Sequence, residues 1–225
     1  MSYIDKFLSP RMKMVVDLAP KSDTICDIGT DHAYVAIKLV KADKAKRVIA
    51  TDINEGPLFY ANKNIRIFNE TKSISTRLSD GFSNIEYNEA QTAIIAGMGG
   101  ETIAKIISLD KGISSFVLQP QSAFYELRLF LVENGFEICR ELVCREGRKM
   151  YTALLCQRGN SPKLSRVELE IGPCLIKERP PLFKEYIEYR LYEIDRILEK
   201  TKGFESAEEK RLEYMALKEE YQKLL

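Results

Sequence analysis

Residues 24–41, TICDIGTDHAYVAIKLVK, have the pattern of a strand, a glycine turn and a helix. Residues 24–29 form a short run of β-favouring residues, and residues 33–41 have the length and apolar spacing of an amphipathic helix. Gly29 lets the backbone turn tightly and pass close to a ligand. A strand, turn and helix of this length form half of a βαβ unit, which predicts a parallel sheet.

The same alternation of strand and helix continues as far as residue 133. Two further strands, at residues 137–144 and 149–157, are joined by a short turn, so they are expected to be antiparallel, because a parallel return needs a dozen residues or more. The expected fold is α/β, with the Rossmann-like, seven-stranded and mostly parallel sheet of a class I methyltransferase. The other predicted strands are residues 47–53, 74–78, 92–98 and 116–119, and the other predicted helices are residues 57–68, 101–108 and 124–133.

The composition changes after residue 160, where the strand pattern ends. Residues 180–225 are rich in Glu, Lys, Tyr and Leu, and their apolar side chains recur at intervals of three and four. Gly203 separates two such runs, and Ser206 with Glu209 matches a capping box for the second. Two helices with a short link are expected to pack as an antiparallel hairpin, a small coiled coil. We therefore predict two domains: a methyltransferase domain, residues 1–160, and a C-terminal helical coiled-coil domain, residues 161–225.

The composition argues against several kinds of site and partner. Lys and Arg number 34 and Asp and Glu number 33, a net charge of +1, which argues against a polyanion bound over the whole surface but leaves room for a local basic patch. Five cysteines without a CxxC pair, beside one histidine, predict neither a metal site nor a disulfide framework. No segment has the ~20 apolar residues of a membrane helix, and the first 13 residues lack the apolar core of a signal peptide, so a cytoplasmic protein without membrane contact is expected.

Acidic residues stand near the ends of the first two strands. Asp27 and Asp31 flank the first glycine turn, where they would repel a pyrophosphate and attract a ligand that carries an ammonium and a sulfonium. They can equally be a turn acid and a helix cap. Asp52 ends the second strand about 20 residues after Gly29, a position from which a carboxylate accepts both ribose hydroxyls of an adenosine cofactor.

The third strand ends in Asp80-Gly81-Phe82. Asp80 can accept the amino group of an adenine and the ring of Phe82 can pack on it, although an ordinary Asp-Gly turn explains Asp80 taken alone. Because acids also stand at the ends of the first two strands, a ligand role is favoured for Asp80.

The fourth and fifth strands end in glycines and amides. Residues 96–100, AGMGG, bring bare backbone to the crevice where α/β sheets bind ligands, and tight packing of a strand on a helix explains one of these glycines but hardly all three. Gln119, Pro120 and Gln121 follow the fifth strand. The side-chain amides of Gln119 and Gln121 can hydrogen-bond a base edge, or the segment can be a plain polar loop.

Together these motifs resemble those of the bacterial tRNA (adenine-22-N1)-methyltransferase family, class I enzymes with a C-terminal coiled coil. The resemblance covers most of residues 4–158, and the tail fits in architecture only. The sequence departs from the family at Val35-Ala36, where Leu-Pro is usual, and at Asp52, where some members carry Glu. The matching segments are Leu8–Arg11 (LSPR), Asp27–Tyr34 (DIGTDHAY), Gly56-Pro57, Asp80-Gly81, Ala96–Gly100 (AGMGG) and Leu118–Pro120 (LQP).

The resemblance implies transfer of a methyl group from S-adenosylmethionine to N1 of adenine 22 in tRNA. It identifies no general base, and candidates to accept a hydrogen bond from the adenine amine are the backbone of Gly97 and Gly99 and the amide of Gln119. The residues expected to bind the cofactor are Asp27, Gly29, Thr30, Asp31, His32, Asp52, Ile53, Asn54, Asp80, Gly81, Phe82, Gly97 and Met98. The residues expected to bind the substrate are Arg11, Tyr34, Gly100, Gln119, Pro120 and Gln121.

Some assignments stay open at this point. His32 at a helix start is expected to shape the site rather than transfer protons, and Tyr34 can stack on the target base or pack in the core. The helical tail can hold the tRNA, dimerise or support the fold, and the oligomeric state is left open between monomer and dimer. The alternative functions are methylation of another RNA position or of a small molecule, and non-catalytic binding of tRNA or protein.

Overall fold

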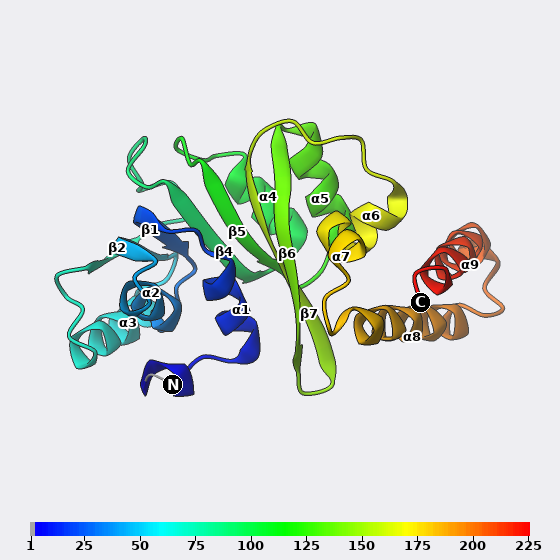
Figure 1. Ribbon diagram of the computed structural model, residues 1–225, viewed down its shortest axis with the longest axis horizontal. Coiled ribbons are helices and arrows are strands. Elements are labelled where there is room, and N and C mark those ends of the chain that lie inside the picture. Colours follow the sequence, from blue (N-terminus) through cyan, green and yellow to red (C-terminus); the bar gives the residue numbers. More distant parts are fainter. Residues whose placement is uncertain (1–2) are drawn as a thin grey trace.

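A central sheet with helices on both faces forms the larger part of the protein (Figure 1). The computed structural model describes residues 3–225. The sheet has the order β3-β2-β1-β4-β5-β7-β6, and β7 runs antiparallel to β5 and β6 while the other neighbours are parallel. This confirms the predicted fold class. The strands are β1 (Ser22–Ile28), β2 (Ala45–Asp52), β3 (Ile74–Leu78), β4 (Thr92–Met98), β5 (Ser115–Pro120), β6 (Phe136–Glu146) and β7 (Lys149–Arg158).

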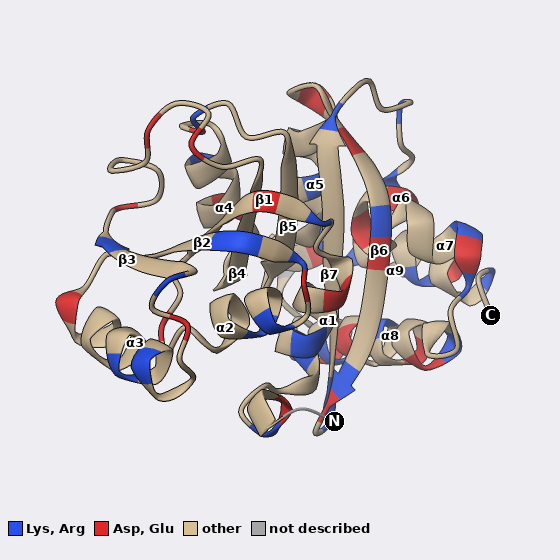
Figure 2. Cartoon of the chain, turned by 60° about the vertical axis from the view of Figure 1, so that its left-hand side comes forward, with Lys and Arg blue, Asp and Glu red and all other residues tan. Residues whose placement is uncertain are grey.

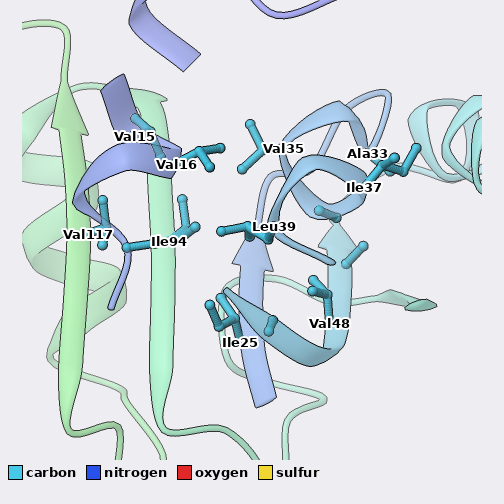
Figure 3. Close-up of a cluster of buried hydrophobic side chains, with 14 of the residues drawn as sticks. Val15, Val16, Ile25, Ala33, Val35, Ile37, Leu39, Val48, Ile94 and Val117 are labelled. Atoms are coloured by element: carbon cyan, nitrogen blue, oxygen red, sulfur yellow. The ribbon is translucent and has the colours of Figure 1, made fainter. Parts of the chain in front are cut away.

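Two apolar clusters hold the helices on the sheet. Helices α1 (Pro10–Leu18), α2 (Tyr34–Lys41) and α3 (Glu55–Ile67) share the cluster on one face. Helices α4 (Gly100–Ile107) and α5 (Phe124–Glu133) share the cluster on the other. Every residue of β5 is buried, as expected for a strand covered on both faces. Figure 3 shows the first cluster, in which side chains of α1 and α2 meet Ile25, Val48, Ile94 and Val117 of the sheet.

Several short helices were not predicted. A 3-10 helix, Tyr3–Lys6, precedes α1, and Ser9 caps α1 by accepting the backbone N–H of Met12 at 3.4 Å. Helices α6 (Arg166–Ile171) and α7 (Pro173–Glu178) follow the sheet, and α6 begins with a capping box. Each is short, and its apolar face is defined by the element it packs on, so spacing along the sequence carries little signal.

The C-terminal helices form the predicted hairpin. Helices α8 (Phe183–Lys200) and α9 (Glu208–Gln222), orange and red in Figure 1, bury Ile187, Ile194, Leu217 and Tyr221 in a third apolar cluster. Met150 of β7 belongs to the same cluster, which therefore joins the hairpin to the sheet.

The capping box predicted at the start of the last helix is wrong. The cap residue of α9 is Ala207, which makes no side-chain cap. Ser206 lies in a short 3-10 helix, Glu205–Ala207, because the chain makes a tighter turn before α9 begins. The domain boundary after residue 160 stays a prediction.

A buried ion pair fixes α6 and α7 to the sheet. Arg128 of α5 donates from Nε to Glu141 Oε1 of β6 at 2.8 Å, and the side chains are 1% and 0% exposed. Arg128 also donates to the carbonyl of Leu169 near the end of α6 at 2.9 Å, and Glu141 accepts the N–H of Cys174 at the start of α7 at 2.9 Å. A Cβ at Gly172, between the two helices, would lie 2.4 Å from Glu141 Oε2, so a larger residue does not fit there.

Within residues 3–225, no helix combines the length and apolar character needed to cross a membrane. The same part of the chain holds no group of three or more His, Cys, Asp or Glu side chains that could bind a metal ion. The five cysteines are free thiols.

Arg128→Met should lower the free energy of unfolding by about 3–5 kcal/mol, because it leaves the Glu141 carboxylate buried without its cation. Urea denaturation measures this loss. The matched control is Arg145→Met, which breaks an exposed ion pair with Glu185 and should cost no more than about 1 kcal/mol. Equal losses in the two variants would show that the buried pair does not fix the helices.

Candidate functional site

A cavity of about 540 Å³ opens at the carboxyl ends of β1, β2 and β4. Strand order reverses between β1 and β4, since the chain proceeds from β1 outward to β3 and then returns to the other side of β1. Ligands of open α/β sheets bind at such a switch point. The volume falls within the range of small-molecule sites, about 300–1,000 Å³.

The turn after β1 forms the floor of this cavity. The N–H groups of Gly29 and Thr30 both donate to the carbonyl of Thr51, at 2.9 and 2.8 Å, which ties the turn to β2. Gly29 has φ +74°, and a Cβ there would lie 2.5 Å from Met98 Cε. The position therefore requires glycine for its conformation, and the end of the Met98 side chain packs beside it.

Asp27 is the buried acid of the site. It is 4% exposed, and its Oδ2 accepts a hydrogen bond from Thr30 Oγ1 at 2.7 Å. Burial raises the pKa of Asp27 to about 6, opposed by the Thr30 hydrogen bond and reinforced by the charge of Asp52. A cation bound in the cavity would stabilise the ionised carboxylate.

The segment from Asp31 to Ala33 is held in a strained conformation. Asp31 and Ala33 have φ +51° and +60°, a region that residues other than glycine rarely adopt and that clusters at functional sites. The carbonyl of His32 accepts from Asn64 Nδ2 of α3 at 2.9 Å. The His32 ring lies 5.8 Å from the ring of Tyr34, centroid to centroid. These contacts place an aromatic surface at the cavity.

The structure brings together more than half of the residues predicted to bind the cofactor. The predicted residues that line the cavity are Asp27, Gly29, Thr30, Asp31, His32, Asp52, Gly97 and Met98. Gly97 has φ +81° and lies at a register shift of β4, which leaves its backbone exposed.

The other predicted cofactor residues lie beside the cavity, at the ends of β2 and β3. Ile53 is 60% exposed, Asp80 is exposed, and Asn54 donates its N–H to Asp52 Oδ1 at 3.0 Å. Gly81 has φ +53°. Phe82 is 1% exposed, and its ring lies edge-on to Phe116 in the core, 6.4 Å between centroids. That ring has no face free for an adenine, because the turn directs it inward to the apolar cluster.

The predicted substrate residues divide into buried and open ones. Gly100 is buried, and a Cβ there would lie 2.3 Å from the carbonyl oxygen of Ala123, so it serves close packing. Pro120 is buried too, while Gly99 precedes α4 as its cap residue. Gln119 is 0% exposed, its Nε2 donates to the carbonyl of Pro120 at 2.8 Å, and its Oε1 accepts from Gln121 Nε2 at 3.0 Å. In this conformation Gln119 cannot reach a base edge, whereas Gln121 is exposed.

The N-terminal segment forms a wall that sequence analysis largely missed. Phe7, Leu8, Ser9 and Met12 line the cavity beside the predicted Arg11. The available signal was Ser9-Pro10, a typical helix start.

The Arg11 guanidinium lies 4.9 Å from the centroid of the Tyr151 ring, and the Arg11 backbone N–H donates to Glu146 Oε2 at 3.3 Å. Within the described part of the chain, Arg11 Nε is buried without a hydrogen-bond partner. Tyr34, also predicted, lies in the cavity wall with its ring stacked on Phe7 at 5.1 Å.

Lys46 and Arg47 lie far from the cavity. Both belong to the first half of β2, the basic segment of that strand in Figure 2, at the opposite edge of the sheet. Lys46 pairs with Asp23 on the surface at 2.7 Å. These cations are therefore surface residues rather than part of the site.

The family model for tRNA (adenine(22)-N(1))-methyltransferase matches residues 25–224. The chain belongs to this family. A Bacillus subtilis tRNA (adenine(22)-N(1))-methyltransferase is 32% identical over 186 residues, which cover 78% of this chain and 78% of the relative. The comparison confirms the resemblance drawn from the motifs.

Two solved structures are similar over nearly the whole chain. The M. capricolum enzyme in complex with S-adenosyl-homocysteine has a TM-score of 0.82 and 31% identity, covering 96% of each chain. A Streptococcus pneumoniae protein in complex with S-adenosyl-L-methionine has a TM-score of 0.81 and 30% identity, covering 97% of this chain and 99% of that one. These similarities confirm the class I methyltransferase fold.

Asp27→Asn should stabilise the ligand-free protein at neutral pH. Between pH 4 and 6 the folded protein keeps a proton on Asp27 that the unfolded chain has lost, so wild-type stability falls relative to the variant as the pH rises through about 6. The advantage of the variant should grow by about 3 kcal/mol between pH 4 and pH 8. Denaturant titrations at several pH values measure it. Asp23→Asn, on the surface at the start of β1, should show no such growth, and a flat difference for Asp27→Asn would exclude the raised pKa.

Proposed function

We propose that this protein transfers the methyl group of S-adenosylmethionine to N1 of adenine 22 in tRNA. The observation that carries the proposal is the cavity at the switch point, which combines Asp27, Asp31 and Asp52 with the bare backbone of Gly29 and Gly97. Membership of the tRNA (adenine(22)-N(1))-methyltransferase family supports the same conclusion. We also propose a cytoplasmic location, where the tRNA substrate is found.

The residues present fit this cofactor. S-adenosylmethionine supplies an activated methyl group on a positively charged sulfur. Asp52 would accept the ribose hydroxyls, and Asp27 and Asp31 would offset the positive charges. Ile53 would offer an apolar surface to the adenine, and Asp80 an acceptor for its amino group. The backbone of Gly97 leaves room for the ligand, since the space where its side chain would stand is open.

The proposed reaction requires little proton transfer by the protein. N1 of adenine carries a lone pair at neutral pH, so no strong base is needed. The residues would act by holding the two reactants in line and excluding water, an effect worth up to about 7–11 kcal/mol. Positive charge develops on the adenine ring, and the backbone carbonyl of Gly97 would accept from its amino group. The carbonyl of Gly99 is already used, because it accepts the N–H of Ile103 at 3.0 Å at the start of α4. Gln119 would act as a positioning residue that holds Gln121.

The target adenine has to leave its helix to reach the cavity. Tyr34 and His32 would present ring faces to the extruded base, and Arg11 would meet the RNA from the N-terminal wall. The rings would offset part of the cost of unstacking.

The proposed activity is tested with labelled cofactor and an unmodified tRNA transcript, followed by mapping of the product. We expect 1-methyladenosine at position 22 and no incorporation when that adenine is replaced by guanine. Methylation at another position, of small molecules only, or cofactor binding without turnover would each contradict the proposal.

Asp52→Asn should weaken S-adenosylmethionine binding about 10- to 100-fold, because hydrogen bonds to a charged group contribute about 1.5–3 kcal/mol. Calorimetry measures the affinity. Asp17→Asn, an exposed position on α1 outside the cavity, serves as control. Unchanged affinity in Asp52→Asn would remove this residue from the cofactor site.

A further inference from the structure

A second cavity, of about 300 Å³, lies between the start of β7, the start of α5 and α8. We call it the β7–α8 cleft. The wall residues that matter here are Gln121, Lys149, Tyr151, Tyr189 and Arg196. Figure 1 shows α8 beginning beside β7 and running away from the sheet, so the cleft lies where the helical hairpin joins the sheet.

The cleft lies beside the cofactor cavity. Because β7 is antiparallel, its first residues lie at the same edge as the carboxyl ends of the parallel strands. Arg11 in the wall of the cofactor cavity places its guanidinium over the ring of Tyr151 in the wall of the cleft, 4.9 Å from the centroid. Gln121 donates its N–H to the carbonyl of Met98 at 2.8 Å, a second link between the two walls. The two cavities therefore adjoin along one edge of the sheet.

The charges of the cleft suit an RNA backbone. Lys149 and Arg196 are exposed, and within residues 3–225 neither forms an ion pair. Arg190 also lines the cleft, but its guanidinium is paired with Glu170 at 3.2 Å and with Glu193 at 3.4 Å. Arg190 is thus shared between two acids, and Glu193 is the one acid among the wall residues of the cleft. Lys149, Arg190 and Arg196 outnumber it, so the charge of the wall is positive.

The aromatic side chains of the cleft suit a base. Tyr189 and Tyr151 are half-buried, and among the described residues their rings do not stack on each other. Burial, with the nearby Glu193, raises the pKa of Tyr189 to about 12, so its hydroxyl stays protonated. Proteins bind unstacked RNA bases on such rings, flanked by cations that contact the phosphates. About 300 Å³ suits one nucleotide and excludes a duplex.

We propose that the β7–α8 cleft binds one unstacked nucleotide of the tRNA next to the extruded adenine, with its base on Tyr189 and the adjoining phosphates at Lys149 and Arg196. The inference rests on the proposed function and adds a second binding site to it. Extruding the adenine exposes the face of a neighbouring base, and the cleft would cover that face. Binding there would lower the cost of base flipping.

The test is a cycle of protein and RNA changes. Tyr189→Ala should lower kcat/KM for tRNA about 5- to 100-fold without changing the affinity for S-adenosylmethionine. Wild-type protein should show a similar loss with a tRNA that is abasic at one of positions 21 and 23. The two changes together should cost no more than either alone. Tyr189→Phe should keep most of the activity, and Tyr87→Ala, 74% exposed and outside the cleft, is the matched control.

The phosphate contacts are tested by salt dependence. Lys149→Ala and Arg196→Ala should each reduce the slope of log affinity against log salt by about 0.7. Lys200→Ala, an exposed position on α8 outside the cleft, should leave the slope unchanged.

The outcomes separate the two proposals. The cleft is overturned as a nucleotide site if the losses in kcat/KM from Tyr189→Ala and from the abasic tRNA add when the two are combined. It is also overturned if Tyr189→Ala lowers kcat/KM no more than Tyr87→Ala does. The abasic tRNAs with wild-type protein decide the matter even if a variant does not fold: full activity with both would also overturn it. Absence of methylation at adenine 22 by wild-type protein on intact tRNA would instead overturn the proposed function.

Discussion

The left-handed turn at Gly29 determines the geometry of the site. Its φ of +74° is a conformation that residues with a side chain rarely adopt, and the end of the Met98 side chain packs beside it. The turn is also tied to β2 through the carbonyl of Thr51, so the ends of β1, β2 and β4 are fixed relative to one another. As a result, the positions of Asp27 and Asp52, on neighbouring strands, are fixed relative to each other. The proposed chemistry depends on this rigid arrangement, since alignment rather than proton transfer is its main requirement.

The proposed reaction joins a cationic cofactor and a polyanionic substrate in one crevice. The acids lie in the cavity at the ends of β1 and β2, and the unpaired cations of the adjoining cleft lie at β7 and α8. This separation lets a chain with a net charge of only +1 offer each ligand the opposite charge locally. The helical hairpin thus supplies part of the surface next to the site, and the buried Arg128–Glu141 pair fixes the short helices that lead to it.

The sequence predicted what depends on local pattern. The strands at residues 74–78 and 92–98 and the helix at 124–133 have the predicted bounds, because alternation and spacing are properties of neighbouring residues. The acids at the strand ends were predicted by the same logic, and their roles stay predictions. The inward position of the Phe82 and Gln119 side chains could not be predicted, because a turn pattern does not say which side chain points inward. The wall formed by Phe7 and Met12 was missed because its contacts join segments far apart in the sequence.

One of those long-range contacts bears on how the protein matures during synthesis. Helix α1 packs against β6 and β7, and the Arg11 N–H meets Glu146, 135 positions later in the chain. A nascent chain emerging from the ribosome can pack its first helix on α2 and β5, but it lacks the part of the docking surface that β6 and β7 supply until those two strands have been translated. Closing so long a loop carries an entropic cost that is offset only once those strands pair. The methyl-donor pocket thus acquires its N-terminal wall late, so incomplete chains lack a finished pocket.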